Sequence, residues 1–357
     1  MTNPLVTAIV DTFNHEAFIE QALDSVLSQG LSQEDLEILV VDDGSTDRTP
    51  QILEKFKRRI RILRKNNGGQ ASAFNVAIPL ARGQIIAFLD GDDWWAKDKM
   101  THVVEAFRDD SRAGVVGHGF YEFDELSERS VAVVPSAARR VSLRTVQDGT
   151  DFRAIMCFLG TSRVAIRKTI LDLVGPIPNA LVVEADEYMS TIAVARSHAL
   201  LLQQPLTYYR LHGGNLYQFR DGDIGKIERK MRVLRELGTT LRGGLSRALL
   251  EDTVIGAVVE PIDVEARRYK LICAGGTSAE TFRVERASMR LSYKHMPWKY
   301  RLFKGFVLAL TLLLPPKTFY KIQHFYSRMD LRRLRRFTGE PVGTGFIDSQ
   351  KGNNDAR

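Results

Sequence analysis

Cysteine is scarce in this chain of 357 residues, which contains only Cys157 and Cys273. Two distant cysteines provide neither a disulfide framework nor the closely spaced ligands of a cysteine-based metal site, and their scarcity is typical of a reducing cytoplasm. After Met1 the chain soon enters an apolar strand, without the basic start and apolar core of a signal peptide. We therefore expect a cytoplasmic globular protein.

Long hydrophobic runs are missing too. The main candidate, residues 306–314, has nine residues, and as a helix it would rise only about 13 Å, against roughly 30 Å for the hydrocarbon core of a bilayer. Aromatic and basic side chains surround it, namely Tyr300, Phe303, Phe319, Tyr320, Lys299, Arg301, Lys304, Lys317 and Lys321. This setting predicts a helix lying on an anionic membrane surface. A buried helix with a solvated basic face is the alternative.

Negative charge is sparse in the same segment. Residues 283–336 contain fourteen Lys or Arg but only two acids, Glu285 and Asp330. Their net charge of +12 exceeds the formal charge of +7 of the whole chain, so the rest of the chain is net acidic. No nucleic-acid-binding motif accompanies the basic residues, and we expect no nucleic acid partner. The charge favours peripheral attachment to the inner face of the membrane.

The most informative motif is an apolar strand, residues 84–90, that ends in the carboxylates Asp90, Asp92 and Asp93. Its unbroken apolar run predicts a buried parallel strand. Ligands collect where such strands end, and clustered carboxylates there are typical of a divalent cation shared with a phosphate. For a motif taken alone, a solvated acidic turn is the alternative.

Two earlier strands end in the same way. Residues 5–10 form a predicted strand followed by Asp11, and residues 37–41 form another followed by Asp42 and Asp43. Apolar periodicity and capping residues predict helices over residues 18–27, 49–57 and 71–81, and a short third strand over residues 60–63. The alternation of strands and helices predicts a doubly wound α/β sheet whose polar clusters share one edge.

Four motifs resemble the signatures of glycosyltransferase family 2. They are the segments around residues 11–14, 40–47, 67–71 and 88–94, and the resemblance extends to about residue 215. It implies an α/β fold of GT-A type, a doubly wound, mixed and mostly parallel sheet flanked by helices, with a C-terminal helical extension. It also implies a nucleotide-sugar donor, inversion at the anomeric carbon, and Mn²⁺ or Mg²⁺ as cofactor. The expected organisation is a catalytic domain over residues 1–222, a mainly helical region over 223–340, and a disordered tail over 341–357.

Carried over to this chain, the resemblance assigns donor-binding residues. Phe13, where the family usually has Tyr, would form an aromatic wall beside the base, and Asp43 would bind the imide of a uracil-like base. Thr12 and Gln70 would also contact the donor. Asp11, also a donor-binding candidate, would face the base pocket; it stands where the family commonly has Pro or a small residue, which leaves the identity of the base open. A core aromatic is the alternative for Phe13, and a helix cap is the alternative for Asp43.

The resemblance also assigns the metal site. Asp90 would reach the ribose or the metal, and Asp92 would ligate the metal. Downstream, Arg210 would bind the diphosphate by charge and fork geometry, and His212 would contact the metal or the diphosphate. A solvated loop side chain is the alternative for His212. The adjacent Gly213-Gly214 pair predicts a mobile lid over the donor.

The acceptor side is marked by acidic residues at the start of a predicted helix. An inverting transfer needs a base that removes the proton of the attacking hydroxyl, and alignment with the family's acidic pair assigns that role to Asp186. Glu187 and Glu184 are rival candidates. An acidic first turn that complements the helix dipole is the alternative.

Together these features predict a metal-dependent inverting glycosyltransferase that moves a sugar from a nucleotide-diphosphate donor, most simply a UDP-sugar, to a hydroxyl of a glycan or lipid-linked acceptor. A non-catalytic nucleotide-sugar-binding or scaffold protein on the same fold is the alternative, because Asp11 and the acidic run around Asp186 depart from the family's pattern. A phosphoryl-transfer hydrolase of the haloacid dehalogenase type would require Thr or Val where this chain has Trp94. Further on, residues 226–250 predict helices broken at Gly238 and at Gly243-Gly244.

Overall fold

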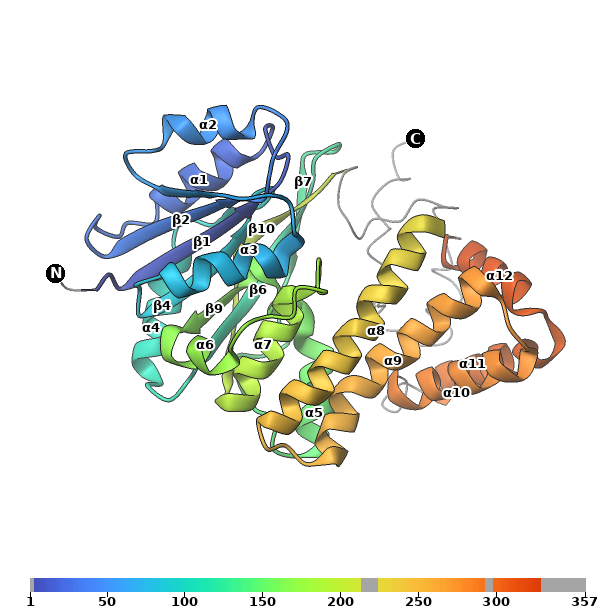
Figure 1. Ribbon diagram of the computed structural model, residues 1–357. Coiled ribbons are helices and arrows are strands. Elements are labelled where there is room, and N and C mark those ends of the chain that lie inside the picture. Colours follow the sequence, from blue (N-terminus) through green and yellow to red (C-terminus); the bar gives the residue numbers. More distant parts are fainter. Residues whose placement is uncertain (1–2, 213–223, 293–297, 329–357) are drawn as a thin grey trace. The chain divides into compact units, whose positions relative to one another are not determined.

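The computed structural model describes residues 3–212, 224–292 and 298–328 (Figure 1). The described chain divides into two compact units. The first comprises the residues up to His212 and the segment Thr239–Val258, and the second comprises the other described residues. The predicted lid at Gly213-Gly214 and the predicted tail over residues 341–357 lie outside the described residues.

One mixed sheet forms the centre of the first unit. Among the described residues its strand order is β3-β2-β1-β4-β9-β6-β10-β5, with β7 beside β6 and β8 beside β10. The strands are β1 (Val6–Thr12), β2 (Leu36–Asp42), β3 (Arg61–Arg64), β4 (Ile85–Asp90), β5 (Trp94–Trp95), β6 (Val115–Asp124), β7 (Arg129–Val133), β8 (Arg139–Val141), β9 (Val164–Arg167) and β10 (Ala199–Leu211). Strands β3, β2, β1 and β4 are parallel, whereas β9 runs antiparallel to both β4 and β6.

Helices cover both faces of this sheet (Figure 1). They are α1 (Ile19–Leu27), α2 (Thr49–Lys55), α3 (Gly69–Ala77), α4 (Lys99–Asp109), α5 (Val146–Ile155), α6 (Lys168–Val174) and α7 (Ala185–Arg196). Short 3₁₀ turns lie between helices and strands: η1 (Ile78–Leu80) follows α3, η2 (Met156–Phe158) follows α5, and η3 (Thr161–Arg163) precedes β9. The expected doubly wound, mixed α/β sheet is confirmed; its N-terminal strands form one parallel set, and β6 and β10 form a second parallel pair.

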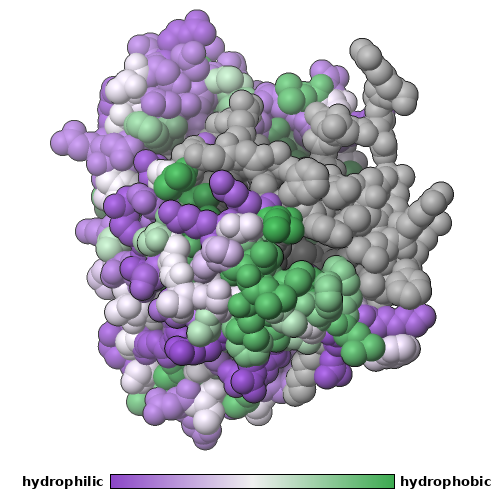
Figure 2. All heavy atoms as spheres, turned by 90° about the vertical axis from the view of Figure 1, so that its right-hand side faces the viewer, coloured by the Kyte–Doolittle hydropathy of each residue, from purple (hydrophilic) through white to green (hydrophobic). Residues whose placement is uncertain are grey.

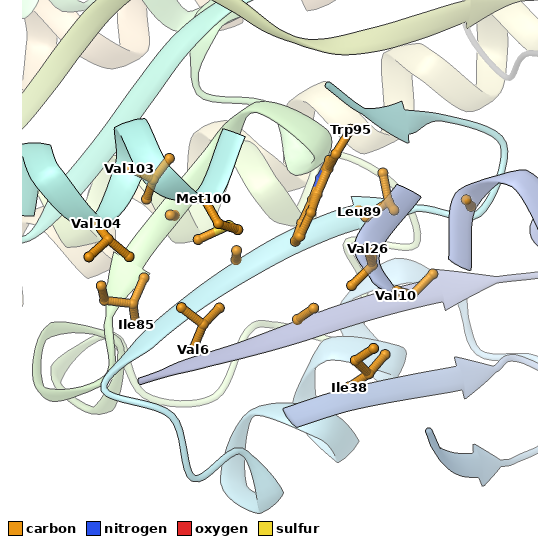
Figure 3. Packing of buried hydrophobic residues seen from close by; sticks show 14 of the residues in the cluster. Val6, Val10, Val26, Ile38, Ile85, Leu89, Trp95, Met100, Val103 and Val104 are labelled. Carbon is orange, nitrogen blue, oxygen red and sulfur yellow. The ribbon is translucent and has the colours of Figure 1, made fainter. Parts of the chain in front are cut away.

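The apolar alternation of the strands forms the core beneath α1 and α4. Val6 and Val10 of β1 lie on the same face as Leu89 of β4, and all three belong to one buried cluster with Val26 of α1 and Met100 of α4 (Figure 3). Burial of each such side chain contributes about 1.5–3 kcal/mol relative to exposure. Because successive strand residues point to opposite faces, Asp11 lies on the face away from α1.

The second unit is built from the C-terminal helices. They are α8 (Ile224–Arg247), α9 (Asp252–Ala274), α10 (Ser278–Ser292), α11 (Trp298–Leu313) and α12 (Pro316–Arg328), of which the ends of α8 and α9 nearest their connection belong to the first unit. Arg268 makes a bidentate ion pair with Glu285 at 2.7 and 2.9 Å, and Tyr320 donates to the same carboxylate. No helix among the described residues is long and apolar enough to cross a bilayer.

The predicted breaks at Gly238 and Gly243-Gly244 are wrong, because α8 runs through all three glycines. A glycine inside a helix costs only about 1 kcal/mol relative to alanine, and packing can offset that cost. A Cβ on Gly244 would lie 2.6 Å from Ile192 Cδ1 and 3.2 Å from the Tyr188 hydroxyl. This glycine therefore permits close packing of α8 on α7 rather than ending the helix.

Candidate active site

The parallel register brings Asp11 and Asp90 side by side. Asp11 of β1 is paired with Asp90 of β4, and the Gly91 amide donates to the Asp11 carbonyl at 2.9 Å. On the other side of β1, Thr12 is paired with Asp42 of β2, and the Asp43 amide donates to the Thr12 carbonyl at 2.9 Å. The ends of three parallel strands thus place their polar clusters at one edge of the sheet.

Asp11 and Asp90 occupy an environment that disfavours ionisation. Asp11 Oδ1 is inaccessible to solvent and has no hydrogen-bond partner among the described residues. Burial and then the charge of Asp92 raise the pKa of Asp11 to about 8. Burial and then the charge of Asp11 raise the pKa of Asp90 well above its ordinary value. Carboxyls crowded in this way favour a neutral form or a bound cation.

Asp92 is the carboxylate that two histidines hold ionised. His212 Nε2 lies 3.1 Å from Asp92 Oδ2, and His15 Nε2 lies 3.9 Å from the same oxygen. Burial alone would raise the pKa of Asp92, but the hydrogen bond with His212 and the charge of His15 lower it overall. His15 was not predicted from the sequence, and its position directly after the Asp11–Asn14 cluster is the signal that could have indicated it.

Asp43 organises the loop that leads into α3. Its carboxylate forms an ion pair with Lys65 and accepts hydrogen bonds from the amides of Gly68, at 3.0 Å, and Gly69, at 2.8 Å. Gly69 has φ +79°, and a Cβ there would lie 2.7 Å from the Val182 backbone. The carboxylate predicted to bind the base therefore also fixes the glycine turn next to Gln70.

Asp186 stands at the start of α7 and is held by the η3 turn. Its Oδ2 accepts hydrogen bonds from the Thr161 amide at 2.9 Å and from the Thr161 hydroxyl at 3.1 Å. Gln70 donates to that hydroxyl oxygen at 2.9 Å and accepts from the Ala185 amide at 3.0 Å. Gln70, Thr161 and Asp186 thus form one chain of hydrogen bonds from α3 to α7.

The rival acids at the start of α7 are placed differently. Glu187 forms an ion pair with Arg153 of α5, so its carboxylate already has a cationic partner. Glu184 precedes the helix with a left-handed backbone, φ +63°. A non-glycine residue at positive φ carries local strain of order 1–3 kcal/mol, a feature that is frequent at functional sites.

Ser162, the residue after Thr161, contacts the predicted donor-side carboxylate, Asp90. Ser162 Oγ accepts the Asp90 amide at 3.1 Å and lies 3.4 Å from Asp90 Oδ2. Its carbonyl accepts hydrogen bonds from Lys99 Nζ, at 2.8 Å, and from the Thr207 hydroxyl, at 2.6 Å. Burial lowers the pKa of Lys99 well below its ordinary value. The buried Lys99 and Thr207 side chains therefore hold the η3 turn in place, and the turn connects Asp186 to Asp90 through hydrogen bonds.

Arg210 is buried among groups of the chain itself. Its Nε donates to the Asp92 carbonyl at 2.8 Å and its Nη2 donates to Gln21. The guanidinium stacks on Phe18 and Trp94, with its Cζ 4.7 and 4.6 Å from the two ring centroids. Arg210 therefore fixes the main chain at Asp92, and its predicted contact with a diphosphate stays a prediction.

Thr12 and Phe13 lie beside this edge with opposite exposures. Thr12 is buried, and its hydroxyl lies 3.2 Å from His15 Nδ1. The Phe13 ring is 41% exposed, which contradicts the alternative of a core aromatic and leaves the ring available to a ligand. The predicted residues from the three strand ends, α7 and β10 are thus brought to one region, and their roles stay predictions.

The carboxyl groups at this edge of the sheet are of the chemical type that binds a divalent metal. Asp11 Oδ1 is an orphaned buried acceptor beside Asp90, and Mg²⁺ in enzymes is often bound by one or two carboxylates together with substrate phosphates. Within the described residues, no three His, Cys, Asp or Glu side chains are arranged to hold a metal on their own. Asp11 and Asp90 therefore suit a metal that a phosphorylated ligand would help to coordinate, and the metal contacts predicted for Asp92 and His212 stay predictions.

Comparison with curated proteins gives relatives that match part of the chain. An uncharacterized glycosyltransferase of Nostoc sp. is 31% identical over 217 residues, which cover 59% of this chain and 66% of the relative. The glycosyltransferase EpsJ of Bacillus subtilis is 41% identical over 135 residues, which cover 37% of this chain and 38% of the relative. The chain thus spans less than two thirds of the length of these relatives.

Solved structures extend the likeness over most of the chain. Staphylococcus aureus TarS, residues 1–349 in complex with UDP-GlcNAc, has a TM-score of 0.59 at 19% identity, and the match covers 89% of this chain and 91% of that one. At this identity the likeness establishes the fold, which is GT-A-like with C-terminal helices. The family model described as "Glycosyl transferase family 2" matches residues 7–170, the part that carries β1, β2, β4 and the η3 turn. Residues 7–170 of this chain are therefore a family 2 glycosyltransferase domain.

Proposed function

We propose that this protein is a metal-dependent inverting glycosyltransferase, which moves a sugar from a UDP-sugar to a hydroxyl of a glycan or lipid-linked acceptor. The observation that carries the proposal is the η3 turn, in which Thr161 bonds to Asp186 and the next residue, Ser162, bonds to Asp90. Transfer requires a base on the acceptor side and a carboxylate on the donor side at a fixed separation. One short, buried turn holds both.

Asp186 is the proposed catalytic base. Its Oδ2 accepts both Thr161 donors and its Oδ1 accepts the Glu187 amide at 2.9 Å, which leaves Oδ1 a lone pair for the acceptor proton. As the acceptor oxygen bonds to the anomeric carbon, the bond from that carbon to the diphosphate oxygen breaks and the acceptor proton passes to Asp186. The ion pair of Glu187 with Arg153 supports Asp186 over Glu187 in this role.

Asp90, Asp92 and His212 are the proposed metal ligands. His212 also hydrogen-bonds to the Asp92 carboxylate. When bound, Mn²⁺ or Mg²⁺ would act as a Lewis acid that neutralises the departing diphosphate. Arg210 keeps the Asp92 main chain in place. Donation from His212 orients the Asp92 side chain, so the geometry of the carboxylate does not depend on the metal alone.

A uracil-containing donor is supported by a relative and by one exposed ring. TarS of Staphylococcus aureus, a poly(ribitol-phosphate) beta-N-acetylglucosaminyltransferase, is 35% identical over 114 residues, and its solved complexes contain UDP and UDP-GlcNAc. The exposed Phe13 ring offers an aromatic surface for a base. For the acceptor, we propose a glycan or lipid-linked glycan on the cytoplasmic side of the membrane, because the C-terminal segment is basic and partly apolar.

The test is nucleotide release from a panel of UDP-, GDP- and TDP-sugars with Mn²⁺ or Mg²⁺. We expect slow hydrolysis of a UDP-sugar without acceptor, and Asp186→Asn should lower transfer by about 10²–10⁴-fold while nucleotide affinity changes little. Glu187→Gln is the matched variant and should keep most of the activity. Tight donor binding without turnover under all conditions would favour the non-catalytic alternative, and an inactive Glu187→Gln beside an active Asp186→Asn would assign the base to Glu187.

A further inference from the structure

Helix α11 carries apolar side chains on two opposite faces. On one face Tyr300 and Thr311 are buried, and Val307 packs against the core of the second unit, a cluster of Val264, Leu271, Val284, Phe319 and Tyr320. This buried face attaches the helix to its unit. The other apolar face is not needed for that packing.

The second face is an exposed stripe. Trp298, Leu302, Phe306 and Leu313 recur at helical spacing and lie on one side of α11. Their exposures are 66%, 64%, 64% and 77%. Figure 2 shows a patch of hydrophobic residues in the view that faces the C-terminal helices. Single exposed apolar residues are ordinary, whereas a continuous stripe indicates an interaction surface.

Positive charge flanks this stripe on α11 and is present on the neighbouring helix α12. Lys299 and Arg301 are exposed and flank it on α11, and Lys317 and Lys321 are exposed on α12. The sequence has no Asp or Glu between Glu285 and Asp330. A second copy of this chain would bring the same positive charge to the surface and be repelled. The complementary occupant is apolar in its interior and negative at its surface.

We infer that the exposed stripe of α11 is the surface by which the protein docks on an anionic lipid bilayer. A helix of this length, about 24 Å at 1.5 Å per residue, is too short to span the membrane and suits the interface. There its apolar face enters the boundary between headgroups and acyl chains, and the flanking Lys and Arg contact the anionic headgroups. This docking surface would bring the protein to the membrane that carries the proposed acceptor. It does not depend on whether the protein transfers a sugar.

The experiment is co-sedimentation of the full-length protein with vesicles of phosphatidylcholine alone or mixed with phosphatidylglycerol. We expect at least tenfold stronger binding to the anionic vesicles, weakened by high salt. The double variant Leu302→Glu, Phe306→Glu should lose at least tenfold in binding. Leu126→Glu is the matched control, because Leu126 is 87% exposed and lies in the first unit, between β6 and β7; it should bind as the wild type does. Emission from Trp298 should shift to the blue on binding, and Trp298→Phe should remove that shift.

Three results would overturn the inference. The first is equal binding of the wild type and the double variant, and the second is no binding of the wild type to either vesicle. The third is a wild-type dimer that the double variant converts to a monomer, with no vesicle binding in either form, which would assign the stripe to self-association. Release of nucleotide from a soluble donor should be unchanged in the double variant, so this outcome is separable from failure of the proposed activity.

Discussion

Thr161 donates both its backbone amide and its hydroxyl to one oxygen of Asp186. The two residues are far apart in the sequence, and the contact forms because η3 lies against the start of α7. Together with the Glu187 amide, which donates to the other oxygen at 2.9 Å, these two donors restrain the orientation of the carboxylate. Since Gln70 donates to the same hydroxyl oxygen, the direction of the hydroxyl proton toward Asp186 is fixed as well.

Thr161→Val should lower turnover without weakening donor binding. The variant keeps the backbone donor and loses the hydroxyl, and a hydrogen bond to a charged group is worth about 1.5–3 kcal/mol, which corresponds to a decrease in kcat of about 10–100-fold. Thr161→Ser restores the hydroxyl and should recover most of the loss. Measured kcat and KM for the donor decide the matter; an equal decrease in donor affinity would mean that Thr161 supports the fold of the site rather than the orientation of Asp186.

Asp92→Asn should cost about 10³-fold in turnover, the scale of losing a main electrostatic stabiliser of a transition state. Donor affinity in the variant should no longer respond to Mn²⁺ or Mg²⁺, because Asn lacks the charge that a hard cation prefers. Isothermal titration with and without the metal provides the measurement. Full activity of the wild type in EDTA would contradict the metal role.

His118 should make the fold sensitive to acid. It is fully buried on β6, its Nδ1 lies 2.7 Å from the Gly119 carbonyl, and Nε2 has no partner among the described residues. Burial, followed by the charge of Lys99, lowers the pKa of His118 well below 6.5. Below pH 6.5 the unfolded chain binds a proton there that the folded chain does not, so the free energy of unfolding falls by up to about 1.4 kcal/mol per pH unit.

The measurement for His118 is chemical denaturation between pH 5 and 7.5 for the wild type and His118→Gln. The wild type should lose stability with falling pH more steeply than the variant, because only the wild type carries this titration. His15, whose pKa burial also lowers, is present in both proteins and cancels in the comparison. Parallel pH profiles would exclude His118 as the source.

Two adjacent glycines of α8 should respond oppositely to alanine. A Cβ on Gly243 would meet only Arg247 Nη1, at 3.4 Å, so Gly243→Ala should stabilise the protein by up to about 1 kcal/mol through helix propensity. A Cβ on Gly244 would meet Ile192 at 2.6 Å, and the side chain would have to move. Thermal unfolding of both variants is the test, and an equal gain in Tm for the two would show that α8 is not closely packed at Gly244.

The parallel half of the sheet could be predicted from the sequence because its rules are local. An apolar run followed by Asp indicates a strand end, and parallel strands align such ends, which is how Asp11 and Asp90 become neighbours. The Thr161–Asp186 pair could not be predicted in this way, since η3 has no periodicity and its partner is on another element. Arg210 has a suitable position in the sequence for binding a diphosphate, yet its stacking on Phe18 and Trp94 depends on tertiary packing.

The C-terminal region was less predictable for a related reason. Glycines in residues 226–250 indicated breaks, and only the neighbouring Ile192 and Tyr188 explain why Gly244 lies within a continuous helix. In α11, the apolar run over residues 306–314 indicates a helix. Which apolar face is buried depends on the cluster around Phe319, whose members come from three other helices, α9, α10 and α12.

The division of the chain affects the order in which the protein can fold during synthesis. The first unit includes Thr239–Val258, which follow a stretch of the second unit. Domains generally fold as units while the chain is made, from the N-terminus onward. Here the ribosome must extend the chain beyond Val258 before the first unit is complete. Until then Tyr188 and Ile192 of the nascent sheet domain lack the segment of α8 that packs against them.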